Sequence, residues 1–240
     1  MQNNLTGLFG KLPAHGDFIY RDLPTTFINV WDEWLQGYVG SAKEQLGEAW
    51  LDVYLTSPIW RFAFSVGVID ENVWAGIMLP SVDRVGRYFP FSIATKLPAT
   101  TNPTEFLMTR AHWYQAMEDI ALQALDGQLS IDDLVEELND SNPIRKSVYT
   151  RGDVVESASK TMFPLANSEQ QPSTVLPYML HSLLARDLNA YSAWSTKGSD
   201  YILPCVAVHA GLPQLSSVAA MMDGHWSERG WQQPILLNDQ

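Results

Sequence analysis

The sequence is poor in cysteine and in positive charge. One cysteine, Cys205, stands among 240 residues, so the chain cannot form an internal disulfide or a zinc site built from several thiolates. Fifteen lysines and arginines face 27 aspartates and glutamates, which gives a formal net charge of −12. Because this excess repels nucleic-acid phosphates and anionic lipid surfaces, broad binding to DNA, RNA or membranes is not expected.

Long hydrophobic runs are also missing. The apolar stretches at 175–184 and 201–212 are short and interrupted by proline and histidine, whereas a membrane-spanning helix needs about 18 or more apolar residues. Residues 1–6 lack the basic and then apolar pattern of a secretory signal. These features lead us to expect a cytoplasmic location.

Familiar catalytic motifs are absent from the sequence. It contains no G-x-S-x-G, H-E-x-x-H or G-x-G-x-x-G pattern, and Gly10-Lys11 is followed by leucine rather than by the hydroxyl residue of a phosphate loop. The five histidines are scattered, without a second ligand at metal-binding spacing along a helix. We therefore predict no catalytic, metal or cofactor-binding residue, and a protein that is not an enzyme.

The pattern of apolar residues predicts an α+β protein. The composition is 46% hydrophobic and 18% charged, which is typical of a globular chain with a large core. Strands are expected at 5–12, 59–68, 73–79, 88–97, 191–195 and 201–209, and helices from Pro24 through Tyr38 and at 103–125, 130–138, 175–188 and 215–222. Strands and helices alternate with hairpins, so we predict a three-layer sandwich: a mixed, largely antiparallel sheet covered by helices on both faces.

The domain organisation is less constrained by the sequence. A length of 240 residues suits one large domain or two packed lobes. We expect a single domain over 1–240, with the possibility of lobes at about 1–148 and 175–240. Segment 149–174 has weak periodicity and is predicted to be a flexible connection.

The first glycine-punctuated segment brings four charged or titratable residues together. Lys11, His15, Asp17 and Arg21 follow one another closely around Gly10, Pro13 and Gly16. They could supply a base, an acid and two cations, or present Lys11 and His15 to a partner. In the structural alternative, which we favour, Asp17 accepts backbone hydrogen bonds and pairs with Arg21.

The second such segment places two arginines around a glycine between apolar strands. It runs from Asp83 through Arg84 and Arg87 to Tyr88. The arginines could pair with Asp17, Asp83 or an acidic helix and so stabilise the sheet. Alternatively, their guanidinium groups could bind a carboxylate or phosphate. The sequence leaves both possibilities open.

Two further features indicate contacts with other proteins. Residues 103–140 contain nine acidic residues and one basic residue, a local net charge of −8 that would suit a basic partner. Most of the nine tryptophans lie at positions typical of a core. Trp226 and Trp231 lie in a polar tail, where they either dock back onto the domain or bind another protein.

Three stretches of the chain resemble the TagF family of type VI secretion accessory proteins. They are Gly10-Lys11-Leu12-Pro13-Ala14-His15-Gly16-Asp17-Phe18, then Leu23-Pro24 with Phe27 and Trp31-Asp32-x-Trp34-Leu35, then the run from Pro80 to Pro90. Trp194-Ser195-Thr196, Gly211-Leu212-Pro213 and Met221-Met222-Asp223-Gly224 are similar to the family's C-terminal pattern. His15 stands where the family more often has serine or another small polar residue.

The resemblance implies a function that composition alone does not. It implies a cytoplasmic, non-catalytic accessory that restrains assembly or firing of the secretion apparatus after translation. Its partner would be a scaffold protein with a forkhead-associated domain, and its candidate interaction or structural motif comprises Lys11, His15, Asp17, Arg21, Asp83, Arg84, Arg87 and Tyr88. Two alternatives remain: a hydrolase of an anionic or phosphorylated substrate, with Asp17 and His15 as acid and base, or a longin-like adaptor.

Overall fold

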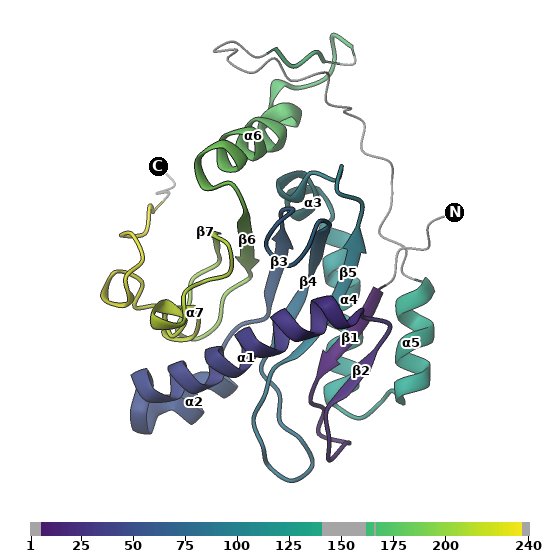
Figure 1. Cartoon of the computed structure of the whole chain (residues 1–240), viewed down its shortest axis with the longest axis vertical. Helices are drawn as coiled ribbons and strands as arrows, with labels where there is room; N and C mark the ends of the chain where they lie inside the picture. Colours follow the sequence, from purple (N-terminus) through teal and green to yellow (C-terminus); the bar gives the residue numbers. More distant parts are fainter. Residues whose placement is uncertain (1–5, 141–161, 166, 237–240) are drawn as a thin grey trace.

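The computed structural model describes residues 6–140, 162–165 and 167–236. In this part of the chain one sheet of seven strands has the order β2-β1-β5-β4-β3-β6-β7, and all neighbouring strands are antiparallel (Figure 1). The strands are β1 (Thr6–Gly10), β2 (Ile19–Arg21), β3 (Trp60–Phe64), β4 (Val73–Leu79), β5 (Phe91–Leu97), β6 (Tyr191–Thr196) and β7 (Cys205–Ala210). Since β6 pairs with β3, the C-terminal strands extend the sheet begun by the N-terminal ones.

Helices cover both faces of this sheet. They are α1 (Thr25–Leu46), α2 (Trp50–Leu55), α3 (Pro103–Thr109), α4 (Ala111–Leu125), α5 (Ile131–Asp140), α6 (Leu176–Leu188) and α7 (Ala220–Asp223). One core joins the sheet to α1, α2 and α7, and a second joins the opposite face to α3, α4 and α5. In Figure 1, α1 crosses in front of the sheet and α4 lies behind it. The predicted three-layer α+β sandwich is confirmed.

The long helix α1 follows directly from its sequence. Pro24 takes the extended conformation just before the helix, and Gly47 ends the helix with a φ of 57°, a conformation that glycine adopts at little cost. Between them, Phe27, Trp31 and Trp34 recur at helical spacing and are buried against the sheet. The indole of Trp31 also donates a hydrogen bond to the Ser92 hydroxyl on β5, at 3.1 Å, so a polar contact fixes the helix over the sheet.

Several predicted boundaries were wrong. The helix expected over 103–125 is divided at Arg110, whose φ and ψ of −101° and 36° are not helical. The strand expected at 201–209 begins only at Cys205, after Pro204, which has no backbone N–H to donate. The helix expected at 215–222 is a 3-10 turn over Leu215–Ser217 followed by the short α7. Helix α2 and strand β2 were not predicted.

The predicted connection at 149–174 is described only in part, because 149–161 and residue 166 lie outside the described residues. Its last residues belong to a 3-10 turn, Pro172–Val175, that leads into α6.

The C-terminal tail docks back onto the domain. The ring of Trp226 meets that of Trp60 edge to face, with centroids 6.3 Å apart. Trp231 donates its indole N–H to the Ser217 carbonyl at 2.9 Å, and Arg229 pairs with the buried Asp223 at 2.7 Å. Of the two possibilities for these tryptophans, the structure therefore shows the docked one.

Candidate interaction site

Two loops that the sequence singled out meet at one end of the sheet. Residues 11–18 join β1 to β2 and residues 80–90 join β4 to β5, and we call them the paired loops. They meet because β1 pairs with β5 in a register that sets Gly10 opposite Phe91. At Gly10 the φ is 136°, and an added Cβ would lie 2.1 Å from the Pro90 carbonyl oxygen, so this approach requires glycine.

Backbone and hydroxyl groups tie the two loops together. The Arg84 N–H donates to the His15 carbonyl at 2.9 Å, and the Ser81 hydroxyl donates to the Lys11 carbonyl at 2.7 Å. These bonds link positions about seventy residues apart in the chain. The paired loops therefore behave as one structural unit.

The carboxylate of Asp83 is the centre of this unit. Its Oδ2 accepts from the Lys11 ammonium at 2.9 Å and from the Arg87 Nε at 2.6 Å. Its Oδ1 accepts from the backbone N–H groups of Val85, at 3.0 Å, and of Arg87, at 2.9 Å. A carboxylate with four donors folds the second loop around itself and fastens it to the first.

The surroundings of Asp83 hold it in the charged form. Burial alone would raise the pKa of this carboxyl, but the hydrogen bonds from Lys11, Arg87 and two backbone N–H groups outweigh burial and lower the pKa well below its ordinary value. Both Lys11 and Asp83 are buried, with side-chain exposures of 6% and 0%. The pair is therefore a desolvated structural ion pair.

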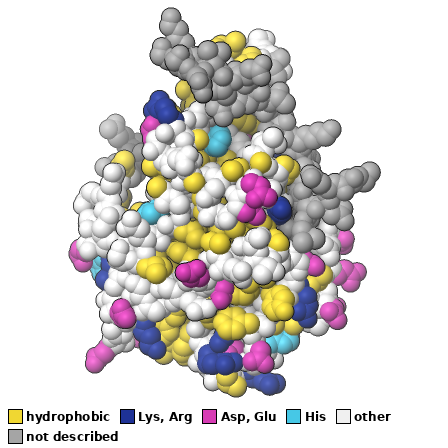
Figure 2. Space-filling view, in the orientation of Figure 1, with side chains coloured by type: hydrophobic (Ala, Val, Ile, Leu, Met, Phe, Trp, Pro, Cys, Tyr) yellow, Lys and Arg dark blue, Asp and Glu magenta, His cyan; other side chains and the backbone are white. Residues whose placement is uncertain are grey.

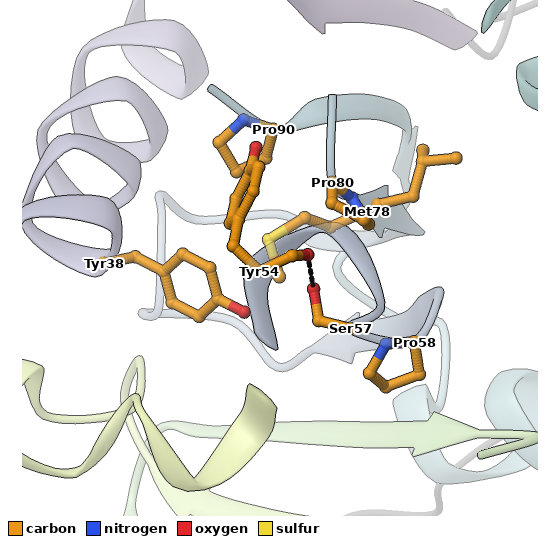
Figure 3. Close-up of a pocket in the computed structure, with 8 residues that line it drawn as sticks. Tyr38, Tyr54, Ser57, Pro58, Met78, Pro80 and Pro90 are labelled. Carbon is orange, nitrogen blue, oxygen red and sulfur yellow. Dashed lines mark hydrogen bonds between the residues drawn. The ribbon is translucent and has the colours of Figure 1, made fainter. Parts of the chain in front are cut away.

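A buried tyrosine supports the base of the second loop. The Tyr54 hydroxyl donates to the Ser81 carbonyl at 2.9 Å and accepts from the Ser81 N–H at 3.0 Å, and burial raises its pKa well above the ordinary value. Beside it lies a cavity of about 10 Å³, flanked by Tyr38 and Tyr54 with Pro80 and Pro90 nearby (Figure 3). This volume holds at most about one water molecule, so the cavity is a packing gap.

The structure corrects two expectations about the first loop. Lys11, which the partner-binding interpretation kept exposed, is buried against Asp83. The expected pair between Asp17 and Arg21 is wrong: the Arg21 guanidinium donates to the Tyr20 carbonyl at 2.7 Å, and among the described residues the cation closest to Asp17 is Arg87 at 3.7 Å. The Asp17 side chain is 99% exposed.

The second loop partly matches its structural interpretation. Arg87 pairs with Asp83, as that interpretation expected, and also donates to the Gly16 carbonyl. Tyr88 is half-buried and packs edge to face on the rings of Trp50 and Tyr54. Arg84 is exposed, and no acidic group of the described residues lies within ion-pair distance of its guanidinium.

The paired loops and β1 share an aromatic cluster that the sequence did not predict. The Phe18 ring stacks on Phe9 at 5.9 Å and meets Phe89 edge to face at 4.8 Å, and the Lys11 ammonium lies 4.9 Å from the Phe18 ring centre. Phe18 nevertheless remains 45% exposed. An aromatic residue beside a glycine-rich loop was the available signal, although its partner Phe89 is distant in the chain.

A larger groove lies elsewhere, between α3 and α6. It has a volume of about 520 Å³ and is lined by residues including Met108, Thr109 and Leu176.

In the described part of the chain, no group of three or more histidine, cysteine or acidic side chains is arranged to hold a metal ion. The helices described there include none with the length and apolar character needed to cross a bilayer.

The fold and the loops together define the class of protein: an α+β sandwich built on one antiparallel sheet. At one end of the sheet, charged residues of two loops form ion pairs and hydrogen bonds with one another. Within this class, the chain belongs to the TagF family. The family model for the TagF N-terminal domain, described as type VI secretion system-associated, matches residues 7–141 and so includes both paired loops. The protein is thus associated with type VI secretion.

A solved structure matches nearly the full length of the chain. The crystal structure of PA0076 from Pseudomonas aeruginosa PAO1 is 29% identical in sequence and superposes with a TM-score of 0.76. The match covers 98% of this chain and 100% of PA0076. No curated protein sequence matches the chain significantly.

Proposed function

We propose that this protein is a non-catalytic accessory of the type VI secretion system that restrains assembly or firing of the apparatus after translation. It acts in the cytoplasm by binding a scaffold protein with a forkhead-associated domain, so that the scaffold is withheld from the machine. Binding is the whole mechanism, and no substrate is turned over.

Family membership supports the link to type VI secretion. The observation that carries the non-catalytic part of the proposal is the set of ion pairs and hydrogen bonds around Asp83. A hydrolytic site would need Asp17, His15 and the arginines to converge on a substrate. Instead the Arg87 Nε is bound to Asp83 at 2.6 Å, and the Asp17 side chain, 3.7 Å from the Arg87 guanidinium, is 99% exposed rather than enclosed in a cleft.

The proposed binding and the absence of turnover can be tested with purified components. Titration calorimetry of the scaffold into this protein is expected to give saturable binding, because a contact of ordinary size, about 800 Å² on each partner, fits a domain this large. The same preparation is expected to leave a generic phosphomonoester unchanged. Absence of binding, or turnover that an Asp17→Asn change abolishes, would contradict the proposal.

A further inference from the structure

The paired loops and the adjoining strand β2 carry exposed arginines and exposed apolar side chains. The apolar members are Val85, Tyr20 and Phe18, with exposures of 65%, 59% and 45%. The cationic members are Arg84 and Arg87, which are also exposed. We call these five residues the tip surface. Figure 2 shows lysine and arginine side chains, with some acidic ones, beside hydrophobic side chains at its lower end, where Figure 1 places these loops.

Contacts between the loops hold three members of the tip surface, Arg84, Arg87 and Phe18, in place. The Gly16 carbonyl accepts from the Arg87 guanidinium, and the neighbouring His15 carbonyl accepts from the Arg84 N–H at 2.9 Å. Phe18 is fixed by the rings of Phe9 and Phe89. The surface is thus preorganised, which lowers the entropy lost when a partner binds.

Its charge contrasts with the rest of the molecule. The chain as a whole carries −12, yet Arg84 has no acidic partner among the described residues, and Arg87 shares the buried Asp83 with Lys11. The exposed Asp17, 3.7 Å from Arg87, is a second acidic group in contact with this surface. A cationic patch on an acidic protein steers acidic partners toward itself and repels the remaining surface from them.

Arg21 does not belong to this surface. Successive strand residues point to opposite faces of a sheet. Ile19, two positions before Arg21 on β2, is buried in the core on the α4 and α5 side, whereas Phe9, which pairs with Tyr20, is buried on the α1 side. Arg21 therefore lies over the face opposite to Tyr20.

We propose that the tip surface docks an acidic face of a folded protein partner, with Phe18, Tyr20 and Val85 in the centre of the contact and the arginines pairing with carboxylates around them. This inference rests on the proposed function, because it takes the scaffold as the partner. A protein face fits better than a single phosphate group, since one guanidinium is already engaged by Asp83 and the apolar centre needs an apolar counterpart. Aromatic and arginine side chains are also the residues that most often dominate protein interfaces.

The test measures the affinity of the purified scaffold for variants by biolayer interferometry at low and high salt. Arg84→Glu is expected to weaken binding by about tenfold or more, and Val85→Asp by a similar factor, while wild-type binding weakens as salt rises. Arg186→Glu is the matched control, because Arg186 on α6 is 69% exposed and undergoes the same charge change far along the chain. It should leave the affinity within about twofold of the wild type.

Each outcome decides the matter. Wild-type binding that Arg84→Glu and Val85→Asp leave intact, in variants whose thermal unfolding is unchanged, overturns the tip surface and leaves the proposed function standing. Failure of the wild type itself to bind overturns both. If light scattering shows a self-associated wild type that Arg84→Glu makes monomeric, while scaffold affinity stays unchanged, the surface instead holds a second copy and the inference is wrong.

Discussion

Replacing Lys11 with methionine tests whether the charged loop residues are structural. Methionine keeps an unbranched apolar side chain of similar length, but it removes the ammonium that lies 2.9 Å from the Asp83 carboxylate and 4.9 Å from the Phe18 ring centre. The expected effect is a loss of stability with little change in shape, because the loops remain joined by the Arg84 N–H and the Ser81 hydroxyl.

The magnitude follows from what the carboxylate retains. Removing one member of a buried ion pair costs about 3–5 kcal/mol when the other charge is left uncompensated. Here three other donors remain, so the loss approaches that of one hydrogen bond to a charged group, about 1.5–3 kcal/mol. For a domain of this size, a loss of about 2 kcal/mol corresponds to a fall in the unfolding temperature of roughly 4–8 °C.

Thermal unfolding followed by circular dichroism, with urea unfolding as a second measurement, checks this value. Lys96→Met makes the same chemical change at a half-buried position on β5 where the described residues provide no ion pair, and it should shift the midpoint by only about 1–2 °C. If Lys11→Met shifts it no more than Lys96→Met does, the ion pair does not hold the loops and the reasoning is refuted.

Two further predictions concern the same end of the sheet. The first concerns pH. Because the folded-state pKa of Asp83 is lowered, the contribution of this carboxylate to stability is complete above the unfolded-state pKa of about 3.9 and is lost as the pH falls below that value. In urea unfolding, the difference in stability between the wild type and Asp83→Asn should therefore be largest near pH 6 and shrink below pH 4. The second concerns the close approach at Gly10. Gly10→Ala should destabilise the protein by about 3 kcal/mol or more, because the φ at this position is 136° and the new Cβ would meet the Pro90 carbonyl. Gly40→Ala, inside α1 with open space around it, should instead stabilise the protein by about 0.5–1 kcal/mol. Equal effects of the two glycine changes in chemical unfolding would contradict this account of the loop contact.

The parts of the fold that the sequence predicted well are those governed by local patterns. Strand β4 was predicted with its observed bounds, and α1 was predicted from the spacing of its tryptophans, because apolar periodicity acts over a few residues. The break at Arg110 carries no glycine or proline signal in the sequence. At the break, the Arg110 guanidinium turns back to within 3.4 Å of Glu105 on α3, a side-chain contact that apolar periodicity does not report. The three-residue strand β2 exists only through its pairing with β1, which periodicity does not report.

The candidate site shows the same division. Its residues could be selected from the sequence because glycine and proline mark loops and charged side chains stand out in them. Their roles could not be assigned, because Lys11 and Asp83 are 72 positions apart and meet only through the register of β1 with β5. The difference between the buried Lys11 and the exposed Arg84, both cations in similar loops, is set entirely by that long-range contact.

Secretion by living cells is the most direct test of the claim that this protein restrains the apparatus by occupying its scaffold. Cells that overproduce the wild-type protein should export less of a type VI secreted marker, and cells with the same level of Arg84→Glu should export it at close to the normal rate. Equal suppression by both proteins, or no suppression by the wild type, would contradict the account.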